Sequence, residues 1–283
     1  MNIPVTISQF AHQPKLLPLN KIIESKVFTK VQLSKEDIIT ENNETISPSN
    51  VGTMVDYLTR AILLVDDHAF DIANIKLKED LDLGRISSDD FVRVMDKEKQ
   101  LNRIVKNCSE IDKLPEETFQ FARDICAWEE AYRSGLYVKP DTYPDEVTIA
   151  HIKKMLKIVE NFFNTFGWPI RDAFGATTKN HYLKGDGDYL LKNILVDLKA
   201  SKARSMQIYW VRQLLVYYTL GFYNHFNDDE INRLMIFNAR TNTVYYVDLS
   251  DIDKSVFDFV NDAAEKQSKI NERALKQLGI EIE

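Results

Sequence analysis

The chain has 283 residues, a net charge of −7 at neutral pH and a hydrophobic content of 44%. This composition is typical of a globular protein, and with only 9 glycines and 8 prolines it excludes a collagen-like or linker-dominated chain. The acidic balance also excludes a protein that coats nucleic acid by its overall charge, because such a protein would be basic. Any contact with nucleic acid must therefore depend on a local positive surface or on a bound cation.

Membrane and secreted classes of protein are disfavoured by the same sequence. No apolar run approaches the roughly 18 residues that a membrane-spanning helix needs. The first residues lack the basic and apolar segments of a secretory signal. Two cysteines, Cys108 and Cys126, are too few for a disulfide scaffold or a cysteine-based zinc site. We therefore expect a cytoplasmic protein without a membrane partner.

The first half of the chain is predicted to be mainly helical. Short strand-like pieces lie near residues 27–31, and Ser47-Pro48-Ser49-Asn50 has the composition of a helix start. Apolar residues at helical spacing then predict helices over residues 51–66, 69–80, 88–108 and 116–135.

A break with two prolines at residues 140–146 is the expected internal boundary. It separates an N-terminal, mainly helical region, residues 1–146, from a second domain, residues 147–283. The second domain mixes helices with strands and is predicted to be an α/β core. Its expected elements are a helix over residues 147–166, strands over 181–191 and 194–200, a helix over 206–223, strands over 231–237 and 243–248, and a helical end from 252.

The candidate catalytic and metal-binding residues lie on the two strands at 181–191 and 194–200. The two residues between these strands, Lys192-Asn193, fit a tight hairpin that would pair them. Strand residues alternate between faces, so Asp197 and Lys199 point the same way. Asp188 can lie beside Asp197 across the hairpin, and Asp186 is a second candidate for that place. Carboxylates are ligands that Mg²⁺ prefers, and a lysine beside the ion can orient or deprotonate a bound water.

A bland alternative exists for these residues, namely an ion pair on an exposed strand face. The interpretation of these residues as a metal site is supported by a resemblance to a known family. Asp188 (or Asp186) followed by Asp197-Leu198-Lys199 resembles the D and D-x-K elements of the PD-(D/E)XK nuclease superfamily. Gln213 and Tyr217 resemble the Q-x-x-x-Y element of its RecB-like branch, and as i and i+4 they share one helix face.

The resemblance covers roughly residues 147–250, and the first motif lacks the proline of the family name. It implies an α/β fold with an αβββαβ core, in which helices flank a mixed sheet. Residues 49–60 also resemble the opening of stand-alone bacterial and phage proteins with this core. A DNA nuclease that requires Mg²⁺ or Mn²⁺ is therefore implied, with a role in phage defence or DNA processing.

The same resemblance implies roles for individual residues. The catalytic residues would be Asp188, Asp197, Lys199 and Gln213. The metal ligands would be the same two aspartates, with Asp186 and Glu160 as further candidates. Tyr217 would contact the substrate. Lys202 lies in a run of basic residues around the site, which predicts a local positive surface for DNA.

Two other functions stay open at this point. The chain can be a catalytically inactive DNA-binding or adaptor subunit that retains the nuclease fold, in which the helical half binds a protein partner or a second copy of the chain. It can also be a helical scaffold with an accidental motif, which predicts no four-stranded sheet.

Overall fold

The structure is a computed structural model that describes residues 6–19, 23, 25–35, 38–39, 43–108, 110–223 and 231–277. By packing, the chain divides into two compact units. The sheet unit comprises Met1–Glu36, Phe166–Lys199 and Ala203–Glu283. The helical unit comprises Asp37–Thr165 and Ala200–Lys202.

The sheet unit contains six strands and the helices that pack on them. Its strands are β1 (Thr29–Gln32), β2 (Arg171–Thr177), β3 (Lys184–Leu191), β4 (Ile194–Lys199), β5 (Arg233–Asn238) and β6 (Thr243–Asp248). Its helices are α1 (Ile7–Ala11), α7 (Ile208–Tyr218) and α8 (Lys254–Gln277), with short helical turns η2 (Ser25–Val27), η5 (Thr219–Tyr223, a π-helix that continues α7) and η6 (Leu249–Asp251).

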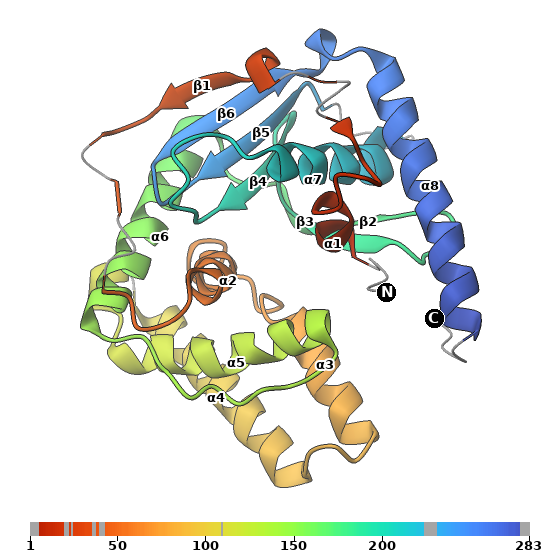
Figure 1. Cartoon of the computed structure of the whole chain (residues 1–283). Coiled ribbons are helices and arrows are strands. Elements are labelled where there is room, and N and C mark those ends of the chain that lie inside the picture. Colours follow the sequence, from red (N-terminus) through yellow and green to blue (C-terminus); the bar gives the residue numbers. More distant parts are fainter. Residues whose placement is uncertain are drawn as a thin grey trace. The chain divides into compact units, whose positions relative to one another are not determined.

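The strands form one mixed sheet in the order β1-β6-β5-β4-β3-β2 (Figure 1). β4 and β5 are parallel, and every other neighbouring pair is antiparallel. The parallel pair needs a crossover connection, and α7 provides it. α7 lies against β3, β4 and β5, and α1 contacts both α7 and β3 (Figure 1).

An apolar face on α7 explains why this helix covers the sheet. Val211, Leu214 and Leu215 recur at helical spacing and are fully or almost fully buried. They belong to the same hydrophobic cluster as Leu190 of β3 and Leu195 of β4. Leu195, Asp197 and Lys199 alternate along β4, so the strand presents the two charged side chains on the face that α7 covers.

The helical unit is built from α2 (Pro48–Leu58), the π-helix η3 (Thr59–Leu63), α3 (Asp71–Asp82), α4 (Ser88–Asn107), the short η4 (Ile111–Lys113), α5 (Glu116–Ser134) and α6 (Glu146–Phe166, whose last residue joins the sheet unit). Side-chain caps set two of the helix starts. Ser47 accepts from the Asn50 N–H, and Ser87 forms a capping box with Asp90. α5 ends at Gly135, whose φ of 82° is a left-handed conformation that glycine adopts without strain.

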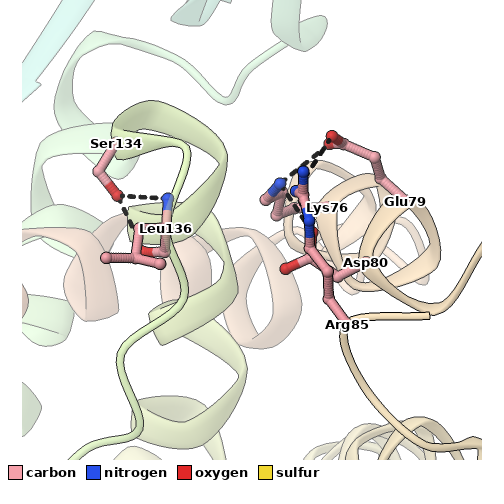
Figure 2. Close-up of polar contacts among 6 residues, drawn as sticks. All are labelled: Lys76, Glu79, Asp80, Arg85, Ser134 and Leu136. Carbon is pink, nitrogen blue, oxygen red and sulfur yellow. Dashed lines mark hydrogen bonds and ion pairs between the residues drawn. The ribbon is translucent and has the colours of Figure 1, made fainter. Parts of the chain in front are cut away.

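A buried ion pair fixes the end of α3. Lys76 Nζ lies 2.9 Å from Asp80 Oδ1 and 3.2 Å from Glu79 Oε2, and the Lys76 and Asp80 side chains are almost completely buried (Figure 2). Arg85 adds a second cation 3.1 Å from Asp80. Figure 2 also shows Ser134 bonded to the main chain of Leu136 at the end of α5. The ion pairs join the last turns of α3 to Arg85 beyond its end, and the Ser134 bonds hold the turn that follows α5.

The sequence-based expectation of an α/β fold, with helices flanking a mixed sheet, is confirmed, and a purely helical scaffold is excluded. The helix expected at 147–166 and the hairpin at Lys192-Asn193 are also present. The strand β2 was not predicted. The expected boundary at 146/147 differs from the division by packing, because β1 pairs with β6 and α6 groups with the helices that precede it.

Candidate active site

The β3–β4 hairpin brings the predicted carboxylates to neighbouring positions. Leu191 pairs with Ile194 across the turn, and Asn193 adopts a positive φ of 65°, which asparagine tolerates better than most residues. The pairing extends to Tyr189 opposite Val196, so Asp188 and Asp197 follow one step further along the two strands. Asp188 Oδ2 accepts a hydrogen bond of 2.6 Å from the Leu198 N–H. The carboxylate of one strand is thereby fixed to the backbone of the other.

Lys199 occupies the centre of the site. Its Nζ lies 2.7 Å from Asp197 Oδ2 and donates a hydrogen bond of 3.0 Å to Gln213 Oε1 on α7. The side chain of Asp197 is 1% exposed and that of Lys199 is 17% exposed. A carboxylate buried to this degree requires a neutralising partner, and the ammonium supplies it from the same strand face.

Two opposing effects set the protonation of Lys199. Burial lowers the pKa of the ammonium, because a charged group is less well solvated inside the protein. The carboxylates of Asp197 and Asp188 outweigh burial, and the pKa of Lys199 is raised above its ordinary value. Lys199 is therefore a cation at neutral pH. In this state it can donate hydrogen bonds and stabilise negative charge, but it cannot accept a proton.

The orientation of the Gln213 amide follows from its partners. Lys199 can only donate, so the amide oxygen must face it. The amide nitrogen then donates to Tyr217 Oη and to Ser8 Oγ, both at 3.3 Å. The predicted Gln213 and Tyr217 pair thus shares one helix face and reaches Lys199. Ser8 of α1 was not predicted, because no local pattern connects it with α7.

Glycines flank the aspartates of β3 because two neighbours approach the strand closely. A Cβ on Gly187 would lie 2.0 Å from the ring of Phe174 on β2. A Cβ on Gly185 would lie 3.2 Å from the Cβ of Ile7 on α1. Asp186 lies between these glycines and is exposed. Because Gly185 and Gly187 turn toward Ile7 and Phe174, strand alternation places the Asp186 side chain on the opposite face of β3.

Two further predictions, for Glu160 and Lys202, concern residues outside this cluster. Glu160 is half-buried on α6 in the helical unit, and Lys202 is exposed in the connection between β4 and α7. The basic residues of α6 are partly engaged elsewhere. Lys153 donates to the carbonyls of Asp112 and Leu114, and Lys157 pairs with the Asp112 carboxylate. These two lysines are therefore held within the helical unit.

The donor set fits one kind of metal site. Within the described ranges, no group of three or more histidine, cysteine, aspartate or glutamate side chains is arranged to hold a metal ion. Asp188 and Asp197 are two carboxylates, and Mg²⁺ is commonly held by one or two carboxylates together with waters and substrate phosphates. Zinc sites need three or four protein ligands. The residues present fit Mg²⁺ or Mn²⁺ better than zinc.

Comparison of the chain with protein-family models, with curated proteins and with solved structures finds no match. Among the helices of the described part of the chain, none has the length and apolar character needed to cross a membrane.

Proposed function

We propose that this protein is a metal-dependent nuclease that hydrolyses DNA phosphodiester bonds. One observation carries the proposal: the Lys199 ammonium lies between the Asp197 carboxylate and the Gln213 amide, with Asp188 bonded to the adjacent backbone. Two carboxylates and a cationic donor on one sheet face are a suitable arrangement for phosphoryl chemistry.

Each residue of the site would have a separate role in the reaction. Asp188 and Asp197 would hold Mg²⁺ or Mn²⁺, which supplies positive charge and an activated water when bound. Lys199 would donate to a phosphate oxygen and stabilise the charge that develops there. Gln213 would hold the ammonium in place through its amide oxygen. The cationic state of Lys199 suits this role, because the donor must be protonated when the substrate binds.

The order of elements supports the proposal at the level of the fold. α6, β2, β3, β4, α7 and β5 follow one another along the chain, which is the αβββαβ order that the resemblance to PD-(D/E)XK nucleases implies. The candidate carboxylates lie on the second and third of these strands, and Gln213 lies on the helix after them. Fold analogy alone does not define an activity, so the side-chain cluster is the stronger support.

The remaining assignments belong to the same proposal. Tyr217, which lies in the sheet unit with the other site residues, is a candidate substrate contact. A cytoplasmic role in phage defence or DNA processing, with a protein partner or a second copy of the chain, fits a stand-alone nuclease of this kind.

The proposal is tested by a cleavage assay with the full chain, a DNA substrate and Mg²⁺. Asp188→Asn is the informative variant, because the asparagine oxygen can still accept from the Leu198 N–H while the negative charge is lost. We expect the wild type to cleave and both Asp188→Asn and Lys199→Ala to lose cleavage. Lys192→Ala, an exposed lysine in the hairpin turn, is the matched control and should cleave normally. Equal cleavage by all four proteins would disprove the assignment.

A second function is favoured by one feature of the same site. Lys199 pairs with Asp197 at 2.7 Å and can neutralise the buried carboxylate by itself, as an inactive adaptor that retains the fold would require. An adaptor would bind DNA or a partner in the presence of chelator and would release no heat on titration with Mn²⁺. A nuclease would give a heat of Mn²⁺ binding that disappears in Asp188→Asn.

A further inference from the structure

The N-terminal segment Thr6–His12 contacts the candidate site at several points. Thr6 forms an isolated bridge with Lys184 at the start of β3. Ile7 lies against Gly185, where any larger residue on β3 would crowd it. The ring of His12 stacks on that of Tyr209 at a centroid distance of 4.3 Å. The segment is thus held against both the strand and the helix that carry the site residues.

One polar contact from this segment reaches the site itself. Ser8 Oγ accepts from Gln213 Nε2 at 3.3 Å, and Gln213 Oε1 accepts from Lys199 Nζ at 3.0 Å. Lys199 in turn pairs with Asp197. The four side chains form a continuous chain of hydrogen bonds from α1 to the buried carboxylate.

The Gln213 amide determines which groups donate and which accept along this series of hydrogen bonds. A glutamine side chain rotated by 180° would present its NH₂ group to the Lys199 ammonium, and two donors would then face each other. With the oxygen facing Lys199, the NH₂ group donates to the hydroxyls on the far side, Ser8 Oγ and Tyr217 Oη. Tyr217 belongs to the family-like motif. Ser8 lies 205 positions away in the sequence, outside the region that the resemblance covers.

We propose that Ser8 is a positioning residue of the candidate active site, which holds the NH₂ end of the Gln213 amide in place and through it the Lys199 ammonium. The inference rests on the proposed nuclease function. It adds the N-terminal segment to a site that is otherwise built from β3, β4 and α7. Loss of the Ser8 hydroxyl removes one of the two acceptors of the Gln213 NH₂ group and leaves Tyr217 Oη, so the effect on the rate is partial.

Steady-state DNA cleavage with Mg²⁺ tests the role of Ser8. Ser8→Ala should lower kcat roughly threefold to tenfold, the range of one neutral hydrogen bond, and leave KM unchanged. Ser8→Thr keeps the hydroxyl and should restore kcat. Gln9→Ala is the matched control, because it removes the side-chain contact from Gln9 to the Thr6 N–H in the capping box of α1 but leaves the Ser8 hydroxyl in place; it should keep the wild-type kcat. In a Gln213→Ala background, Ser8→Ala should have no further effect.

Two outcomes of this assay would overturn the inference while the nuclease function stands: wild-type kcat in Ser8→Ala, or an equal loss in Gln9→Ala. A wild type that does not cleave would instead remove the nuclease function and with it the role of Ser8. A second measurement does not need activity. In urea unfolding without metal, the effects of Ser8→Ala and Gln213→Ala should be non-additive, and strictly additive effects would contradict the contact.

Discussion

Lys199 Nζ lies 2.7 Å from Asp197 Oδ2, and both side chains come from one face of the same strand. The contact neutralises a carboxylate that is 1% exposed. It also holds the ammonium on the side of the strand where α7 supplies Gln213. The same pair is therefore expected to affect both stability and activity.

The first prediction concerns the stability of this pair. Lys199→Ala leaves the Asp197 charge buried without its ammonium, which should lower the free energy of unfolding by about 3 kcal/mol. Adding Asp197→Asn removes the stranded charge and should recover part of that loss. Urea unfolding of the two variants and of the exposed control Lys192→Ala measures the difference. A loss in Lys192→Ala as large as in Lys199→Ala would contradict the prediction.

The second prediction concerns the glycine between the two aspartates of β3. Gly187→Ala places a methyl group 2.0 Å from the Phe174 ring, and overpacking of a buried site should cost about 1–3 kcal/mol or more. Gly175→Ala on β2 is the control, since nothing lies within 4 Å of the added methyl. Combined with Phe174→Ala, Gly187→Ala should cost less than it does alone. Equal costs at Gly175 and Gly187 would show that the ring does not limit the site.

The third prediction is a pH dependence in the helical unit. Burial and the hydrogen bond from its hydroxyl to Asp124 raise the pKa of Tyr143 to about 12. Because the folded pKa exceeds the unfolded value of about 10, the contribution of Tyr143 is fully present below pH 10. It is lost as the pH rises through about 12. We expect the stability advantage of wild type over Tyr143→Phe to be constant from pH 8 to 10 and to shrink above pH 10. A constant difference up to pH 11.5 would refute this.

Much of the fold could be predicted because its signals are local. The helix before the site, the hairpin and the strands after α7 follow from apolar spacing and turn composition. The strand β2 could not be predicted, because Arg171-Asp172-Ala173-Phe174-Gly175-Ala176-Thr177 is poor in β-branched residues. It is an edge strand, and its pairing with β3 stabilises it.

In the candidate site too, local patterns predict some features and leave others unpredicted. Asp197 and Lys199 share a strand face by alternation alone, and Gln213 and Tyr217 share a helix face by their spacing. The pairing of β1 with β6 and the contact between Ser8 and Gln213 join residues about 200 positions apart. Such contacts depend on how the finished units pack, and no local pattern in one sequence reveals them.

Binding of Mn²⁺ to the metal-free full chain, measured by titration calorimetry, tests the central claim most directly. The wild type should bind with a measurable heat, and Asp188→Asn should lose at least tenfold in affinity. Asp251→Asn removes the same charge from an exposed carboxylate of the sheet unit and should bind as the wild type does. A wild type without heat, or an Asp188→Asn variant that binds equally well, would contradict a metal site formed by the two strands.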